Sequence, residues 1–332
     1  MTRNILFRAD AHPAIGTGDL TSFINLAAYF KKRKWNSHFI IKNYKAGINL
    51  LKRNQVTNFR IISEKFNIKQ ETKIINAYIK RNKINALFLQ KSDGDFIDYN
   101  QIDRNIFRAC AYFKKDLPAG YDLVLNWDVN SKNYFKIQKY PDTKFFLGPE
   151  YVILPINFDQ KAIRNRVYRK DRKTVLVVLG GGVDKYDFTF KAIKKLDKQK
   201  CTMKVKIILG PAYQNIKHLR DFLKHSSLKY EVVLNAKNMF REFMNCDVAI
   251  AAGGLTAFES VSTRTPALLV SLYKHQIDRC RYFAKNKKVK YLGFCNIDNL
   301  YKEDLYSFTP RRLPEFKNRI TEVVDYIDEV CR

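Results

Sequence analysis

The stretch of sequence that decides the fold is CDVAIAAGGLTAFE, which runs from Cys246 to Glu259. The apolar run Val248–Ala251 predicts a buried strand, the pair Gly253-Gly254 allows a tight turn, and a helix is expected to begin near Thr256. Exposed backbone N–H groups at such a helix start suit a diphosphate. Glu259 lies one turn into the helix, where it can accept hydrogen bonds from two ribose hydroxyl groups or form a capping box with Thr256.

Apolar runs of the same kind alternate with helical patterns along the rest of the chain, which predicts parallel sheets covered by helices on both faces. In the first half the predicted strands are Ile5–Ala9, His38–Lys42, Phe59–Ser63, Ala86–Gln90, Ala109–Phe113 and Leu123–Asn126. In the second half they are Thr174–Leu179, Val205–Leu209, Glu231–Leu234, Val248–Ala251 and Ala267–Val270. The predicted helices are Asp19–Lys34, Phe188–Leu196, Ile216–Lys224, Leu255–Thr263 and Asp278–Lys285.

The length of 332 residues favours about two domains. Lys161–Lys173, with the sequence KAIRNRVYRKDRK, carries seven basic residues and one acidic residue, and such a run is usually a solvated connector. We therefore predict an N-terminal α/β domain over residues 1–160, a basic linker over 161–173, a C-terminal α/β domain over 174–310 and a last helix over 311–332.

The chain is strongly basic, with 61 Lys and Arg against 32 Asp and Glu, a formal net charge of +29. This charge indicates an anionic partner, such as a phosphorylated or acidic sugar or an anionic membrane surface, or else a lysine-rich composition with no such role. Nucleic acid is disfavoured as a partner because no known nucleic-acid-binding module accompanies the basic clusters.

The six cysteines form no C-x-x-C pair, and the motifs expected to line the cleft lack a clustered Asp-x-Asp pair, so we expect neither a metal site nor a cofactor. The first residues are too weakly apolar for a signal peptide, and no apolar run reaches 18 residues. We expect a cytoplasmic protein. Peripheral contact with the inner membrane face through the basic patches is an open alternative.

A second candidate site follows the first predicted strand. Gly16 and Gly18 flank a turn that opens the first helix, where backbone N–H groups can approach an anion. The pattern is not the G-x-G-x-x-G of dinucleotide sites, so such a cofactor is disfavoured. Asp19 is either the N-cap of that helix or a catalytic carboxylate. Arg8 and Asp10 are expected to bind substrate in the same cleft, or to form an ion pair with each other.

Two further strand ends carry candidate residues. Gly180 and Gly181 lie at the end of the first strand of the second half, where they make either a substrate-binding loop or a plain tight turn. Lys274-His275-Gln276 lies at a later junction between a strand and a helix.

In order along the chain, these motifs resemble a known family. The shared motifs are Arg8-Ala9-Asp10, Ile15-Gly16-Thr17-Gly18, Leu179-Gly180-Gly181, Asn238-Met239, Gly253-Gly254-x-Thr256-x-x-Glu259, Pro266 and Gln276. Together they are similar to the nucleotide-sugar hydrolases of pseudaminic acid synthesis and to spore-coat polysaccharide proteins, which in turn resemble the UDP-N-acetylglucosamine transferase of peptidoglycan synthesis. The resemblance implies a GT-B architecture of two doubly wound, Rossmann-like domains facing a cleft. It also implies a UDP-linked sugar, with Gly253, Gly254, Leu255, Thr256, Glu259 and Gln276 on the nucleotide side.

The chain departs from this family on the sugar side. Asp19 replaces the histidine expected to activate water, Leu89-Gln90-Lys91-Ser92 replaces an Ile-Asp-His-Tyr segment, and His275 replaces an asparagine. The residues on the nucleotide side match the family, so we expect a nucleotide leaving group and changed chemistry on the sugar side.

Three functions remain open. The first choice is an inverting glycosyltransferase of surface glycan biosynthesis that uses a glycan or lipid-linked acceptor, with Asp19 as the base and His275 as the reserve candidate. The second is a UDP-sugar hydrolase in which Asp19 activates water. The third is a catalytically silent nucleotide-sugar-binding protein, in which Asp19 only caps a helix.

Overall fold

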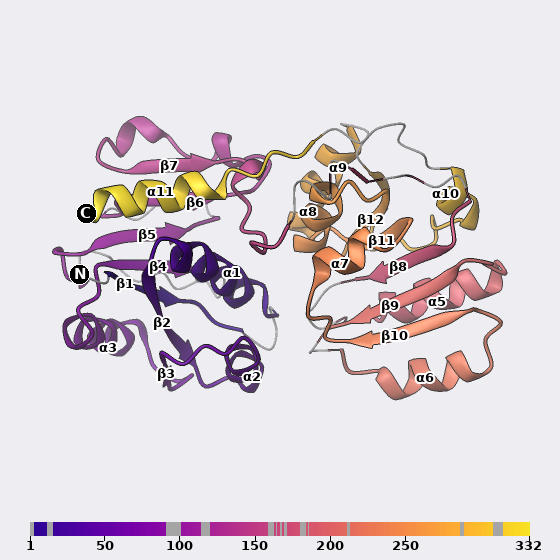
Figure 1. Cartoon of the computed structure of the whole chain (residues 1–332), viewed down its shortest axis with the longest axis horizontal. Helices are drawn as coiled ribbons and strands as arrows, with labels where there is room; N and C mark the ends of the chain where they lie inside the picture. The colour runs from indigo at the N-terminus through magenta and orange to yellow at the C-terminus, as the bar shows by residue number, and fades with distance from the viewer. Residues whose placement is uncertain are drawn as a thin grey trace. The chain divides into compact units, whose positions relative to one another are not determined.

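The computed structural model describes residues 3–11, 16–90, 101–113, 120–158, 163, 165, 166, 168, 171–179, 184, 186–210, 213–285, 289–307 and 315–332. The chain forms two compact units (Figure 1). Unit 1 consists of Met1–Ile156 together with Asn318–Arg332, and unit 2 consists of Asn157–Lys317.

Unit 1 is built on a seven-stranded parallel sheet in the order β3-β2-β1-β4-β5-β6-β7 (Figure 1). The strands are β1 (Arg3–Arg8), β2 (Trp35–Lys42), β3 (Phe59–Ile62), β4 (Ala86–Gln90), β5 (Phe107–Ala111), β6 (Leu123–Asn126) and β7 (Lys144–Leu147). The helices are α1 (Gly18–Lys32), α2 (Lys45–Arg53), α3 (Ile68–Arg81) and α11 (Ile320–Val330), with 3₁₀ turns at Ser131–Asn133, Ile137–Lys139 and Pro149–Tyr151.

Aromatic packing fixes α1 against this sheet. The ring centroid of Phe7 on β1 lies 5.2 Å from those of Phe23 on α1 and Phe39 on β2, and Phe23 lies 5.2 Å from Phe88 on β4. All four side chains are buried, and burying a side chain of this size stabilises a fold by about 1.5–3 kcal/mol. The first turn of α1 is therefore held at a defined place above the ends of β1 and β4.

Unit 2 is built on a six-stranded parallel sheet in the order β10-β9-β8-β11-β12-β13. The strands are β8 (Thr174–Val178), β9 (Lys204–Leu209), β10 (Tyr230–Leu234), β11 (Val248–Ala252), β12 (Ala267–Ser271) and β13 (Lys290–Phe294). The helices are α5 (Phe188–Lys198), α6 (Ile216–Lys224), α7 (Met239–Met244), α8 (Leu255–Ser262), α9 (Ile277–Lys285) and α10 (Lys302–Ser307), with a 3₁₀ turn at Lys274–Gln276.

The strand order reverses direction once in each sheet. In unit 1 the reversal lies between β1 and β4, and in unit 2 it lies between β8 and β11. Ligands of open α/β sheets bind beyond the carboxyl ends of the strands at such a switch point. The predicted sites after β1 and after β11 therefore both lie where this fold class holds its ligands.

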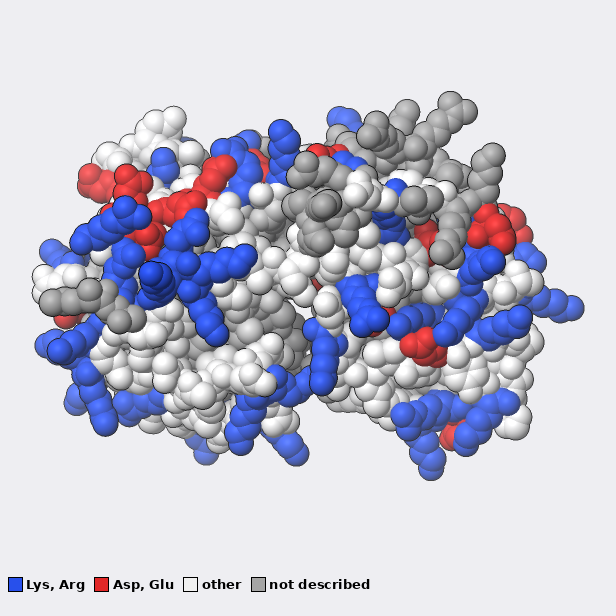
Figure 2. Space-filling view, in the orientation of Figure 1, with Lys and Arg blue, Asp and Glu red and all other residues white. Residues whose placement is uncertain are grey.

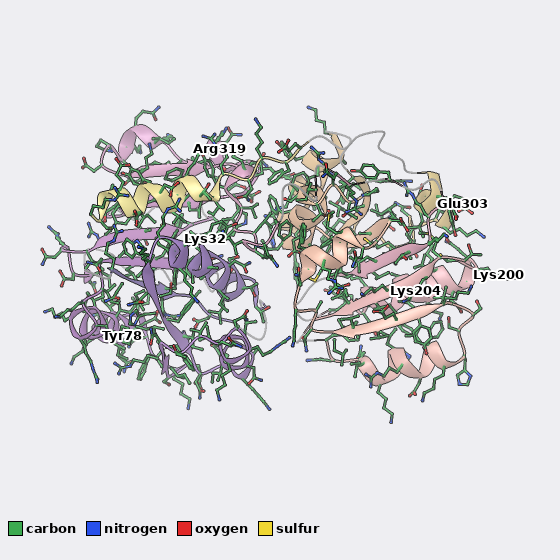
Figure 3. All side chains as sticks on the ribbon, in the orientation of Figure 1. Lys32, Tyr78, Lys200, Lys204, Glu303 and Arg319 are labelled. Carbon is green, nitrogen blue, oxygen red and sulfur yellow. The ribbon has the colours of Figure 1, made fainter. Side chains whose placement is uncertain are left out.

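The last helix, α11, belongs to unit 1 although it follows unit 2 in the sequence. Asp328 on this helix accepts a hydrogen bond from Trp35 Nε1 at 2.6 Å and pairs with Arg3 at 2.7 Å. At its start, the backbone N–H of Arg319 donates to the carbonyl of Glu150 at 2.7 Å (Figure 3). These contacts tie the end of the chain to β1, to β2 and to the 3₁₀ turn after β7.

The segment expected to be a solvated linker is instead packed on unit 2 where the structure describes it. Arg166 donates through Nη1 to the carbonyls of Phe243 and Thr263 at 3.0 and 3.1 Å, and through Nη2 to the carbonyl of Cys246 at 2.5 Å. Arg172 is only 6% exposed and donates to the carbonyl of Leu305 at 2.6 Å. The prediction from charge alone was wrong for these two residues, because backbone carbonyls at or just after the ends of α7, α8 and α10 compensate the burial of their guanidinium groups.

Arg166→Ala is expected to lower the free energy of unfolding of unit 2 by about 2–4 kcal/mol, because it leaves several partly buried carbonyl groups without a donor. Urea unfolding followed by circular dichroism measures the change. Arg220→Ala is the matched control, since Arg220 lies exposed on α6 in the same unit. Equal unfolding midpoints for the two variants would contradict the anchoring role of Arg166.

Lys and Arg side chains are spread over the face of both units that Figure 2 shows, rather than gathered at one place. In the basic cluster Lys31–Lys34, two lysines end α1, where cations suit the helix dipole, and Arg33 pairs with Asp325. None of the helices that the structure describes has the length and apolar character needed to cross a membrane.

Candidate functional site

The candidate site in unit 1 begins at the end of β1. Arg8 is 0% exposed, and its guanidinium donates to Asp10 Oδ2 and to Glu71 Oε1 on α3, both at 2.8 Å. Burial alone would raise the pKa of Asp10, but the Arg8 guanidinium and the backbone N–H of Lys42 outweigh it and hold that pKa below its ordinary value. The ion pair that the sequence left open as an alternative is thus formed. Arg8 Nη1 remains buried without a hydrogen-bond acceptor among the described residues.

The turn before α1 is built as the glycines suggest, but Asp19 does not cap the helix. Gly16 has a φ of +100°, which a residue without a Cβ adopts readily. Thr17 occupies the N-cap position and α1 begins at Gly18, so Asp19 is the second helical residue. Asp19 therefore lies inside the first turn of the helix, and the N-cap interpretation was wrong. Asp19 Oδ1 accepts a hydrogen bond from Gln90 Nε2 at 2.8 Å.

The candidate site in unit 2 begins where β11 ends. The backbone N–H of Gly253 donates to the carbonyl of Val270 at 2.9 Å, and its own carbonyl accepts from Arg279 Nη1 at 2.9 Å. A Cβ on Gly253 would lie 2.5 Å from Cys280 Sγ and 2.9 Å from Gln276 Cβ. Only glycine fits this position, which brings the end of β11 directly against α9.

Gly253→Ala is expected to destabilise unit 2 by about 1–3 kcal/mol, because the added methyl group overpacks a site closed by Cys280 and Gln276. Gly18→Ala is the control: no atom lies within 4 Å of an added Cβ there, and alanine stabilises a helix by up to about 1 kcal/mol relative to glycine. Urea unfolding curves of both variants measure the effect. A wild-type midpoint for Gly253→Ala would contradict the close packing.

Helix α8 begins at this glycine turn and carries a buried carboxyl group. Gly254 is the N-cap, half-buried Leu255 is the first helical residue, and no side chain caps the helix. The Thr256 hydroxyl donates to the carbonyl of Ala252 at 2.9 Å, so the predicted capping box with Glu259 is not formed. Glu259 is 8% exposed, and burial raises its pKa to about 7. Within the described residues its carboxyl group has no hydrogen-bond or ionic partner.

The junction after β12 adds a second polar side chain. Gln276 is 6% exposed, and its Oε1 accepts from the backbone N–H of Leu272 at 2.9 Å. Its Nε2 lies 3.6 Å from the place where a Cβ on Gly254 would stand, so the amide borders the start of α8. His275 is exposed, and its ring stacks on Tyr273 with centroids 5.7 Å apart and planes 9° apart.

The structure thus groups most of the predicted residues around the two switch points. Gly253, Gly254 and Gln276 meet at the start of α8, and Arg8 meets Asp10. Gly180 and Gly181 lie outside the described residues. Among the residues that are described, no three His, Cys, Asp or Glu side chains converge as a metal site.

No family model matches the chain. It is 27% identical to the uncharacterized protein MJ1062 of Methanocaldococcus jannaschii over 291 residues, 84% of this chain and 57% of that protein. It is 28% identical to the spore coat polysaccharide biosynthesis protein SpsG of Bacillus subtilis over 180 residues, 52% of this chain and 50% of SpsG. A third relative, from Helicobacter pylori, is named as a pseudaminic acid cytidylyltransferase and UDP-2,4-diacetamido-2,4,6-trideoxy-beta-L-altropyranose hydrolase. The chain is 27% identical to it over 161 residues, which are 48% of this chain and 28% of that protein. The resemblance to these protein groups is confirmed, and the matches span between 28% and 57% of the relatives' lengths.

Solved structures show the architecture. MurG of Acinetobacter baumannii matches with a TM-score of 0.60 and 16% identity over 98% of this chain and 99% of MurG. The chain has the GT-B fold. The Neisseria meningitidis UDP-GlcNAc 2-epimerase, solved with UDP-GlcNAc, matches with a TM-score of 0.58 and 13% identity over 98% of this chain and 99% of that one. UGT71G1 of Medicago truncatula, solved with UDP-glucose, matches with a TM-score of 0.54 and 11% identity over 100% of this chain and 94% of that one. The GT-B prediction is confirmed.

Three residues that matter in this GT-B chain were not predicted as site residues: Glu71, Gln90 and Arg279. Glu71 is acidic and Gln90 is polar, yet both side chains are buried, with exposed fractions of 1% and 3%. The signal for Gln90 was present in the sequence, because a polar residue ends the apolar strand ALFLQ. Glu71 and Arg279 lie in helices rich in polar residues, where one more charge carries no signal.

Proposed function

We propose that the chain is an inverting, nucleotide-sugar-dependent glycosyltransferase of surface glycan biosynthesis. The observation that carries this proposal is the carboxyl group of Glu259, which is 8% exposed and has no hydrogen-bond or ionic partner among the described residues, one turn into the helix that starts uncapped at the switch point of unit 2. A carboxyl group is costly to bury without a partner, so its place is explained by a ligand that supplies hydrogen-bond donors. The hydroxyl groups of a ribose are such donors.

Unit 2 would hold the nucleotide. The backbone N–H groups at the start of α8 follow Gly254 and carry the positive end of the helix dipole, which suits a diphosphate. The Gln276 Nε2 group borders the same turn. The nucleotide sugars present in two of the related structures, UDP-GlcNAc and UDP-glucose, support this assignment and favour uridine as the base.

Unit 1 would supply the base. In inverting transfer the acceptor oxygen attacks the anomeric carbon, the bond from that carbon to the diphosphate oxygen breaks, and UDP departs with the electron pair. The acceptor hydroxyl gives its proton to a carboxylate, for which Asp19 is the first candidate because it lies at the switch point and is not used as a cap. His275 is the reserve candidate. The net charge of +29 favours a glycan or lipid-linked acceptor that is anionic or lies at an anionic membrane.

A UDP-sugar hydrolase is the second candidate, favoured by the name of the Helicobacter pylori relative. The same carboxylate would then take the proton from a water molecule, and the sugar would leave with a free anomeric hydroxyl group. The two candidates share the nucleotide site and differ only in the molecule that Asp19 deprotonates.

The test is to incubate the full chain with UDP-N-acetylglucosamine and UDP-glucose and to follow UDP release without an acceptor and with a glycan acceptor. Release that depends on the acceptor supports the transferase. Fast release without an acceptor demotes the transferase and supports the hydrolase. A chain that binds neither UDP nor UDP-sugars refutes both.

A further inference from the structure

Gln90 is a polar residue in an apolar position. It is the last residue of β4, whose five residues are all buried, and it is itself only 3% exposed. β4 lies beside β1 at the switch point of unit 1. A buried amide needs a hydrogen-bond acceptor for its nitrogen and a donor for its oxygen.

The nitrogen has its partner. Gln90 Nε2 donates to Asp19 Oδ1 at 2.8 Å, which joins the end of β4 to the first turn of α1 across 71 positions of sequence. Turning the amide over would set Oε1 against the carboxylate, with two acceptors facing each other. The carboxylate therefore fixes which end of the amide is which, and the amide in turn holds the carboxylate in one orientation.

The oxygen has no partner among the described residues. Gln90 Oε1 is buried and accepts no hydrogen bond within the part of the chain that the structure describes. Because Asp19 fixes the amide, a flip does not satisfy this oxygen, and among the described residues no donor reaches it, so a bound molecule that brings a donor can satisfy it. Hydroxyl and amide N–H groups are donors, whereas an ionised phosphate or carboxylate group offers only acceptors.

We propose that Gln90 is the positioning residue of Asp19 and, through Oε1, part of the binding site for the molecule that Asp19 deprotonates. That molecule presents a hydroxyl or amide N–H group here, and an anionic group is excluded from this place by the carboxylate and by the amide oxygen together. The inference rests on the proposed function, since it takes Asp19 as the base. It narrows the substrate class: an acidic acceptor must carry its charge elsewhere.

Kinetics of Gln90→Leu test the inference, because leucine has a similar size and neither a donor nor an acceptor. The turnover number for UDP release from UDP-N-acetylglucosamine is expected to fall roughly 10-fold to 100-fold, as for a misplaced reacting group. The affinity for UDP, measured by titration calorimetry, is expected to stay within about twofold. Gln101→Leu is the matched control, since Gln101 is exposed in the same unit. A turnover number that Gln90→Leu leaves unchanged would overturn the proposal.

A spectroscopic test needs no turnover. The full chain is labelled with ¹⁵N in its nine glutamine side chains, and the Gln90 amide pair is identified as the signal missing in Gln90→Leu. Asp19→Ala is expected to shift this pair and to leave the other eight in place. If the Gln90 amide signal keeps its position in Asp19→Ala, the positioning role is overturned, even when the wild-type chain is an active enzyme. Absence of UDP binding would refute the proposed function, while this comparison would still decide whether Gln90 holds Asp19.

Discussion

Asp19→Asn is expected to lower the rate of UDP release by about 10²-fold to 10⁴-fold, the usual contribution of a positioned general base. Asparagine has nearly the same shape as aspartate, and its Oδ1 can still accept the hydrogen bond from Gln90 Nε2. What it loses is the ability to take a proton. The affinity for UDP is expected to stay unchanged, because the residues assigned to the nucleotide belong to unit 2.

Initial rates of UDP release, together with calorimetric titration of UDP, measure this effect. Asp221→Asn serves as the control, since Asp221 is exposed on α6 and pairs only with the neighbouring Lys224 in the described structure. A variant that keeps the wild-type rate would show that Asp19 is not the base, and His275 would then be tested in the same way. A variant that loses rate and UDP affinity together would indicate a general folding defect.

Glu259→Gln is expected to make the unliganded chain more stable at pH 8 and to bind UDP more weakly. Burial raises the pKa of Glu259 to about 7, from an ordinary value of 4.5. At pH 8 the folded chain therefore holds a carboxylate that burial disfavours, at a cost of up to about 3 kcal/mol. The neutral amide removes this cost. It also replaces an ionised acceptor for ribose hydroxyl groups, which should weaken UDP binding roughly 10-fold to 100-fold.

The pH dependence has a definite sign. Below pH 4.5 the Glu259 carboxyl group is protonated in both the folded and the unfolded chain, so it does not change stability with pH. Between pH 4.5 and about 7 only the folded chain keeps the proton, so its contribution to the free energy of unfolding falls as the pH rises. Above a pH of about 7 the carboxyl group is ionised in both the folded and the unfolded chain, and its contribution to the free energy of unfolding has been lost completely. Glu259→Gln should abolish this part of the pH dependence.

Urea unfolding at pH 5 and pH 8 measures the stability difference for Glu259→Gln, and Glu303→Gln is its control. Glu303 is exposed on α10 of the same unit (Figure 3). Equal effects of the two variants on stability and on UDP affinity would contradict the role of Glu259.

The sheet architecture was predictable because buried parallel strands are continuous apolar runs. The predicted strands Ala86–Gln90 and Val205–Leu209 match β4 and β9 closely. Two edge strands were not predicted, β7 and β13. β7 has only four residues, KFFL, and β13, KYLGF, has a glycine with a φ of +124° and a register shift against β12. Short or irregular edge strands lack the pattern that identifies central ones.

Helix α3 was missed although it carries a readable start signal. Asn67 Oδ1 accepts from the backbone N–H of Gln70, and the Gln70 side chain accepts from the backbone N–H of Asn67, which makes a reciprocal capping box. The helix itself, IKQETKIINAYIKR, is mostly polar. Its packing against the sheet decides the structure more than its sequence periodicity does.

The candidate site was predictable residue by residue but not contact by contact. Gly253 and Gly254 could be placed because they follow β11 directly, and Glu259 because it lies one turn into the helix that comes next. The partner of Arg8 on α3 lies 63 positions away, and the partner of Asp19 lies 71 positions away. Such contacts depend on which strands are neighbours in the sheet, and no local pattern in the sequence specifies that. Both capping interpretations failed for the same local reason, because each helix begins two residues earlier than a cap at the candidate residue requires.

Calorimetric titration of the full chain and of Glu259→Gln with UDP tests whether the start of α8 and Glu259 hold the nucleotide. We expect binding of one UDP per chain at pH 8 and a clear loss of affinity in the variant. Absence of binding, or equal affinity in both proteins, would contradict the assignment of the nucleotide to the start of α8.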